Sequence, residues 1–225
     1  MIENTLNKNA QVCLQKLLRI WFDFEKQLIQ VPIIRRLENG TFTKNDYLLL
    51  LLHLRQQVIE GSRWISRCAS SFDRSFSDVR SEVIHHAKDE HLDYLMIESD
   101  YASLGGDKTK IQSGERNIGS EALHGYLMYK SSQPNPIDLI GAMWIVEGLG
   151  QKMAHGWATR IEELLLVKNA TTFMEYHGEN DDVHMEKLYK LLDLACTDES
   201  ISESIQKTAQ TVARLYLLQL EEIHE

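Results

Sequence analysis

The stretch YHGENDDVH, residues 176–184, carries two histidines and an aspartate at a spacing suited to binding a metal ion. On a helix that turns by about 100° per residue, His177, Asp181 and His184 fall within roughly 60° of one another. These positions, i, i+4 and i+7, usually carry apolar core contacts. Imidazole and carboxylate groups occupy them here, and both are common ligands of divalent metals. The stretch therefore predicts a helix with three metal ligands on one side.

A second candidate is Glu147, which lies in the otherwise uncharged run GAMWIVEGLG, residues 141–150. Burying a carboxylate without a partner is strongly unfavourable, so a buried Glu147 needs a cation, a metal or hydrogen-bond donors. A glutamate at the helix surface, or one paired with an arginine, is the simpler alternative. The residues alone leave both interpretations open.

A third stretch, EVIHHAKDEHLDY at residues 82–94, is dense in histidine and acid. These side chains cannot all face one way on a helix. His91 shares a stripe with Ile84, Ala87 and Leu95, and this apolar company predicts that His91 points inward. The alternative for any single histidine here is an ordinary histidine–acid pair on an exposed helix face.

Long segments with apolar residues at intervals of three and four must position these groups, and this pattern predicts an all-α protein. Thr43 can cap a helix ahead of Asp46, and the glycines of LGGD, residues 104–107, suit a helix C-cap. No linker divides the chain, so residues 1–225 are expected to form a single domain. The expected helices, about seven in number, are 5–30, 43–72, 76–104, 118–131, 135–166, 168–194 and 198–224.

The bulk composition excludes several classes of function. A formal net charge of −9 argues against a nucleic-acid partner and against an anionic membrane surface. The longest apolar run, residues 47–54, is too short to span a bilayer. The N-terminus lacks the pattern of a secretory signal, and the three cysteines are widely separated. A cytoplasmic protein with reduced thiols is expected.

Four segments resemble the haem-oxygenase-like fold in its non-haem branch of iron-containing redox enzymes, the relatives of thiaminase II and of the pyrroloquinoline quinone synthesis enzyme C. The resemblance covers most of the chain and implies a single-domain helical bundle. The segments are VPIIRRLENGTFTKNDYLLLLLHLRQ, HHAKDEHLDYLMIESDYASLGG, WIVEGLGQKMAHGWATRIEELL and FMEYHGENDDVHMEKLYKLL. The last is similar to the family's His-x-x-x-Asp-x-x-His signature.

Carried over by position, the resemblance implies that His177, Asp181 and His184 are metal ligands and that Glu147 is the catalytic carboxylate shared between two metals. It implies that His91 supplies the imidazole of the third helix. The family's di-iron oxidases place a glutamate one or two turns before that histidine, and this chain has Lys88 and Ile84 there. The carboxylates expected in their place are Glu90 and Glu82, with His86 and Glu60 as further alternatives.

The expected cofactor is therefore iron, as two ions, with manganese as an alternative that accepts the same ligands. The expected activity is an O2-dependent oxidation of a small organic substrate, and homodimerisation is left open. Two sister activities are disfavoured, because residues 1–40 contain no histidine to hold haem and residues 69–195 contain no cysteine for thiaminase II chemistry. Two further alternatives remain: a metal-free relative, either a cofactor-independent oxidase or a small-molecule binding protein, and a helical interaction protein with incidental histidines.

Overall fold

Helices make up almost all of the regular structure. The computed structural model describes residues 6–223, and for residues 181–183 it describes the backbone only. Within these residues there is no strand. The α-helices are α1 Lys8–Leu28, α2 Pro32–Glu38, α3 Lys44–Val58, α4 Gly61–Ser71, α5 Ser77–Asp89, α6 Tyr94–Ser103, α7 Lys108–Gln112, α8 Ile118–Ser131, α9 Ile140–Leu149, α10 His155–Leu165, α11 Thr172–Ala195 and α12 Glu199–Glu221.

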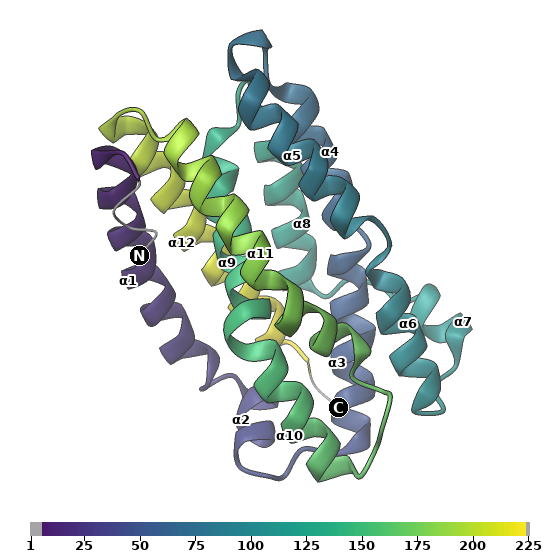
Figure 1. Ribbon diagram of the computed structural model, residues 1–225. Helices are drawn as coiled ribbons and strands as arrows, with labels where there is room; N and C mark the ends of the chain where they lie inside the picture. The colour runs from purple at the N-terminus through teal and green to yellow at the C-terminus, as the bar shows by residue number, and fades with distance from the viewer. Residues whose placement is uncertain (1–5, 224–225) are drawn as a thin grey trace.

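The core is organised around α9. Nine of its ten residues are buried, and Glu147 is the one charged residue among them. The helix is apolar on nearly every side, as expected for a helix enclosed by others. It packs against α1, α11 and α12, and Figure 1 shows α11 crossing in front of it. The environment of Glu147 is therefore the interior of the bundle.

Local sequence signals define several helix ends. The Thr43 hydroxyl accepts a hydrogen bond from the Asp46 backbone N–H, and the Asp46 carboxylate accepts one from the Thr43 backbone N–H, which completes a capping box. Gly105, after α6, has φ +78°, a left-handed conformation that favours glycine. Both ends were expected from the sequence.

The seven expected helices are present as segments, but three are divided. The expected helix 43–72 ends at Val58 and restarts at Gly61, and helix 76–104 is interrupted by a 3-10 turn at Glu90–Leu92. Helix 135–166 begins with a 3-10 turn and contains a π-helical segment, Gly150–Ala154. These breaks keep the chain in helical turns, so the apolar spacing does not reveal them. The short helices α2 and α7 were not expected, and the expected ends at residues 5 and 224 lie outside the described residues.

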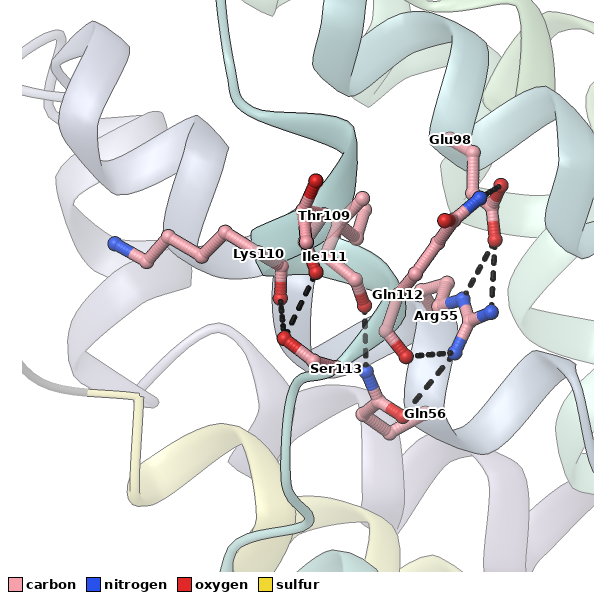
Figure 2. A network of polar contacts seen from close by, with 8 residues as sticks. All are labelled: Arg55, Gln56, Glu98, Thr109, Lys110, Ile111, Gln112 and Ser113. Carbon is pink, nitrogen blue, oxygen red and sulfur yellow. Dashed lines mark hydrogen bonds and ion pairs between the residues drawn. The ribbon is translucent and has the colours of Figure 1, made fainter.

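A buried ion pair attaches α6 to α3. Arg55 donates to Oε1 of Glu98 from Nε at 3.0 Å and from Nη2 at 2.8 Å, and both side chains are buried. Gln112 donates to the second oxygen of Glu98 at 2.8 Å, and Gln56 donates to the backbone carbonyl of Ile111 at 3.1 Å (Figure 2). These contacts fix α6 and α7 on the end of α3. They also fix the chain just after residues 86–93, the segment that supplies part of the site.

The described helices include none that combines the length and the apolar character needed to cross a bilayer.

Candidate metal centre

Glu147 lies at the centre of a buried group of ionisable side chains. Only 3% of its surface is exposed. Its Oε1 lies 3.1 Å from Nε2 of His86 on α5, and its Oε2 accepts a hydrogen bond of 3.0 Å from Nδ1 of His184 on α11. Side chains of three separate helices therefore meet at one carboxylate. Glu147 is therefore neither at the helix surface nor paired with an arginine, the two alternatives that the sequence left open. Its partners are two histidines.

The ring of His177 is oriented by the backbone of its own helix. Its Nδ1 lies 2.8 Å from the carbonyl oxygen of Phe173, and a carbonyl can only accept, so Nδ1 carries the hydrogen. In the neutral ring the lone pair is then on Nε2, which lies 3.3 Å from Oδ2 of Asp93. Two acceptors at this distance attract each other only through a cation, either a proton or a metal ion. Metal-binding histidines typically donate a hydrogen bond from the ring nitrogen that does not bind the metal, as Nδ1 of His177 does here.

Residues 86–93 supply three groups with the same spacing as residues 177–184. His86 ends the inward face of α5, Glu90 opens the 3-10 turn, and Asp93 directly precedes α6. These positions are again i, i+4 and i+7, so the three side chains lie on one side despite the change of helix type. The contacts of α5 and α6 with α11 bring this side toward His177 and His184.

The six side chains form two adjacent donor groups. One contains His86, Glu90, Glu147 and His184, and the other contains Glu90, Asp93 and His177. Within each group, one donor atom per residue lies within 4.8 Å of every other, a separation that suits ligands around one metal ion. Glu90 belongs to both groups. The arrangement therefore offers two neighbouring positions for a cation, joined by one shared carboxylate.

Three donor atoms in these groups have no hydrogen-bond partner within the described part of the chain. They are Nε2 of His86, Oε1 of Glu90 and Oδ2 of Asp93, and all three atoms are buried. Two of them have a close polar neighbour, Glu147 at 3.1 Å from His86 and His177 at 3.3 Å from Asp93, but no complete hydrogen bond. Buried polar atoms are nearly always hydrogen-bonded, so three exceptions at one place favour a ligand that binds them. One metal ion in each donor group would satisfy all three.

The electrostatics of the centre also favour a cation. Burial and the neighbouring charges of Glu147 and Asp93 raise the pKa of Glu90 to about 7, although His86 and His177 oppose the shift. Burial alone would raise the pKa of Glu147, but the charges of His86 and His184 and the hydrogen bond from His184 lower it instead. Three carboxylates in one buried volume repel one another unless positive charge lies between them.

The donor set fits a divalent transition metal. It consists of imidazole nitrogens and carboxylate oxygens without thiolate, a combination that iron and manganese both accept. The described cysteines are buried elsewhere in the chain.

Four of the residues expected from the sequence are brought together: Glu90, Glu147, His177 and His184. Asp181 lies in α11 between the two histidines, and its side chain lies outside the described residues.

The structure does not bring His91 and Glu82 into either group. His91 is exposed, and its Nδ1 lies 3.5 Å from the hydroxyl of Ser62. Glu82 accepts a hydrogen bond of 2.6 Å from Lys190. Glu60, the more distant alternative, pairs instead with Arg63 and Arg116.

The inward face expected for the third segment is wrong for all but Ala87, which is buried. The stripe through His91 was expected to face inward because Ile84 and Leu95 are apolar. In the structure Ile84 is 50% exposed and Leu95 is 45% exposed, whereas His86 is buried. The sequence pattern offers His86 only as a further alternative, and it does not indicate Asp93. The signal that could have found them is the i, i+4, i+7 spacing of His86, Glu90 and Asp93, which repeats that of His177, Asp181 and His184.

Gly178 explains the glycine inside the ligand motif. A Cβ atom at this position would lie 2.9 Å from Cβ of His155 and 3.0 Å from its backbone nitrogen. The missing side chain therefore lets α11 approach the start of α10 closely. This contact sets the position of His177, the adjacent residue, relative to α9 and α10.

A π-helical segment, Gly150–Ala154, follows Glu147 by three residues and packs against α11. Such segments insert an extra residue into a helical turn and are frequent at functional sites. Here the segment lies between Glu147 on α9 and Trp157 on α10, and it changes the rotation of one side chain about the helix axis relative to the other.

A cavity of about 110 Å³ adjoins the centre, and Glu90, Glu147 and His177 contribute to its wall. The remaining wall comes mainly from aliphatic and aromatic side chains of α3, α4, α9, α10 and α12. A mostly apolar cavity with a few polar groups at one place is typical of a small-molecule site.

No protein-family model and no curated protein sequence matches the chain significantly. Solved structures do match. A domain of unknown function with a haem oxygenase-like fold from Shewanella denitrificans has a TM-score of 0.87 at 21% identity, covering 93% of this chain and 91% of that one. A TenA homologue from P. horikoshii has a TM-score of 0.73 at 15% identity, covering 94% and 97%. A TenA homologue from Pseudomonas syringae pv. tomato has a TM-score of 0.73 at 10% identity, covering 94% and 92%.

These similarities establish a haem-oxygenase-like fold that includes TenA homologues among its neighbours. The fold is all-helical and extends over nearly the whole chain, as expected from the sequence. At this level of identity the likeness concerns the fold alone.

Proposed function

We propose that this protein is a non-haem oxidase or oxygenase that holds two metal ions, iron in the first instance, and uses O2 to oxidise a small organic substrate. The observation that carries the proposal is the pair of donor groups that share Glu90. A single ion-paired histidine would not require a second group beside it. Two adjacent groups with a common carboxylate are the arrangement that a two-metal site needs.

The residues that would hold the metals follow from the two groups. His86, Glu147 and His184 would bind one ion, Asp93 and His177 would bind the other, and Glu90 would contact both. Ferrous ions, when bound, supply the electrons with which O2 is reduced. The resemblance adds Asp181, whose side chain lies outside the described residues, to the proposed ligands.

The protein's own residues have three tasks in this proposal. The Phe173 carbonyl holds the His177 ring so that Nε2 faces Asp93. The surrounding helices leave only 3% of Glu147 exposed, which limits the access of bulk water to the centre. The apolar wall binds the substrate next to the same groups. Orientation of the ligands and exclusion of water are the contributions a protein makes to such chemistry.

A thiol-based reaction is not supported by the cavity. Cys13, Cys68 and Cys196 are buried, and none of them contributes to the cavity wall. A nucleophilic thiol must reach its substrate, and it must be partly exposed to do so. The similarity to TenA homologues therefore concerns the fold, and the proposed chemistry rests on the histidines and carboxylates of the two donor groups.

One observation favours a second candidate, a metal-free relative that binds or oxidises a small molecule without a cofactor. The hydrogen bond between His184 and Glu147, with His86 on the other oxygen, neutralises Glu147 without a metal. In this case the histidines and carboxylates would recognise a polar ligand by hydrogen bonds.

Metal counting after anaerobic loading distinguishes the two candidates. The purified protein is incubated with ferrous iron without O2, freed of unbound metal and analysed for iron per chain. The proposal predicts two irons and a transient change in absorption when O2 is admitted. A wild-type protein that binds no more iron than a His177→Ala variant would establish the metal-free candidate instead.

The Glu147→Ala variant separates a metal-binding role from a structural one. Its circular dichroism should match that of the wild type, because the two histidines left behind can be neutral. Its bound iron should fall to one ion or none. Loss of helical content in this variant would show that Glu147 serves mainly as a structural partner of His86 and His184.

A further inference from the structure

The cavity beside the centre has a wall almost without charged side chains. Apart from the members of the two donor groups, its described lining is uncharged, and it contains no lysine or arginine. Leu54, Val58, Trp64, Leu127 and Phe173 are representative of this wall. An anionic group buried in this wall, away from the proposed metal positions, would lack a cationic partner. Burying an unpaired charge is far less favourable than burying a neutral group.

One lining residue offers a hydrogen-bond donor. The indole Nε1 of Trp157 is buried and has no hydrogen-bond partner within the described part of the chain. A buried indole N–H usually finds an acceptor. Trp157 follows the π-helical segment on α10 and contributes to the same wall as Glu147. An acceptor atom on a bound molecule would complete its hydrogen bonding.

We propose that the cavity binds a substrate with an uncharged, largely apolar body that carries a hydrogen-bond acceptor for the Trp157 indole. The inference rests on the proposed function for its location, because the substrate must lie beside Glu90 and Glu147. It adds the chemical character of the part that the wall encloses: an apolar chain or ring with a neutral acceptor such as a hydroxyl, ketone, ether or amide oxygen, with any anionic group confined to the metal positions. Burial of its apolar surface supplies the affinity, and the indole N–H supplies orientation.

Binding of matched probes to the metal-free protein tests the charge preference. 1-Hexanol and hexanoate have the same chain length and differ in charge, and titration calorimetry measures both. The expected result is that 1-hexanol binds at least tenfold more tightly than hexanoate. Metal-free protein is used because a bound metal would itself attract the carboxylate. Equal or tighter binding of hexanoate would overturn the proposal.

Two variants test whether 1-hexanol binds in the cavity and whether the Trp157 indole N–H donates a hydrogen bond to it. Val58 lies on α3 and belongs to neither donor group, so Val58→Trp should fill the cavity and abolish 1-hexanol binding while two irons still bind. Trp157→Phe removes only the N–H and should weaken 1-hexanol about two- to tenfold, the usual worth of one hydrogen bond, with n-hexane unaffected. An unchanged affinity for 1-hexanol in Val58→Trp would place binding outside the cavity. An equal loss for both probes in Trp157→Phe would assign Trp157 a packing role and refute the donor.

The outcomes separate this inference from the proposed function. A protein that binds two irons but no 1-hexanol retains the proposed function and loses the substrate class. A protein that binds 1-hexanol in the cavity but no iron loses the proposed function and retains the preference of the cavity for neutral molecules.

Discussion

At the scale of single residues, the contact between Asp93 and His177 characterises the second donor group. A ring nitrogen with a lone pair faces a carboxylate oxygen at 3.3 Å, and the Asp93 oxygen has no hydrogen-bond partner within the described part of the chain. Such a pair is stable only with a cation between its members. Its position beside the Glu147 group is the reason for proposing two metal ions and not one.

Replacing Asp93 should therefore remove one metal and leave the other. Asp93→Asn keeps the size of the side chain but removes its charge, and the group around Glu147 does not include it. We expect bound iron to fall from two ions to one per chain, measured by elemental analysis after anaerobic loading. His91→Ala is the matched control, because His91 is exposed and contacts Ser62. It should retain both ions, and loss of iron in this control would contradict the assignment of Asp93.

Residue patterns predicted part of this centre. The stripe of His177, Asp181 and His184 stands out because polar residues replace apolar ones at core spacing, and Glu147 stands out because its neighbours are uncharged. The third segment lacks such contrast. Apolar residues at Ile84 and Leu95 suggested the wrong inward face, since exposed apolar residues are common on protein surfaces.

At the scale of elements, the close approach of α11 to α10 depends on the lack of a side chain at Gly178. Gly178→Ala would bring a Cβ atom within 3.0 Å of the His155 backbone nitrogen, and the backbone cannot rotate away as a side chain could. We expect the free energy of unfolding to fall by about 1–3 kcal/mol, the usual cost of overpacking. Iron affinity should fall as well, because His177 would shift with α11.

Gly156→Ala is the control for this prediction. Gly156 is also helical, but a Cβ atom there would meet nothing within 4 Å. Since alanine is favoured over glycine in helices by about 1 kcal/mol, this variant should be as stable as the wild type or more so. Denaturant titration of both variants gives the comparison. Equal stability of the two would show that the α10–α11 contact can relax.

The start of α3 should make stability depend on pH in the acid range. Burial alone would raise the pKa of Asp46, but hydrogen bonds from Thr43 and the charge of Arg36, 2.7 Å away, lower it below its usual range. A carboxyl whose pKa is lower in the folded state stabilises the protein above its unfolded pKa, and the effect disappears as the pH falls through the folded value.

Asp46→Asn should accordingly be less stable than the wild type by about 1–2 kcal/mol at pH 7. The difference in the free energy of unfolding should shrink as the pH falls below about 4. Urea titrations between pH 3 and pH 7 measure it. A difference that is constant over this range would assign the effect of Asp46 to shape instead of charge.

Helix existence was predictable at this scale, and helix interruptions were not. The spacing of apolar residues indicated each long helical segment, and Thr43 and Gly105 marked two of the ends. The 3-10 turn at Glu90–Leu92 and the π-helical segment at Gly150–Ala154 leave that spacing almost intact. They matter because both lie next to donor residues.

For the whole molecule, metal binding should appear as thermal stability. The donors come from segments 86–93, 147 and 177–184, which are far apart in the sequence and converge only in the folded state. A ligand that binds only the folded state stabilises it, by about 2.7 kcal/mol at one hundred times its dissociation constant.

We therefore expect removal of metal by a chelator to lower the Tm by several degrees and readdition of ferrous iron to restore it without O2. The Glu147→Ala variant provides the control, since its Tm should respond much less to the chelator. An equal response in this variant would show that the metal acts elsewhere on the surface. Differential scanning calorimetry measures both.

The overall architecture was the most predictable property. Lack of any alternating strand pattern, sparse glycine and proline, and long helical periodicity left an all-α domain as the one consistent class, and the haem-oxygenase-like neighbours confirm it. The packing of particular helices could not be read in the same way. It depends on contacts such as Gly178 with His155, and a glycine in a sequence does not show what it touches.

The turn at Glu90–Leu92 has a mechanical consequence. It is the joint between α5 and α6, and it carries the one carboxylate that both donor groups share. His86 precedes this turn and Asp93 follows it, so the angle between α5 and α6 sets the separation of the two donor groups. The Arg55–Glu98 ion pair holds α6 on α3 and so helps to fix that angle.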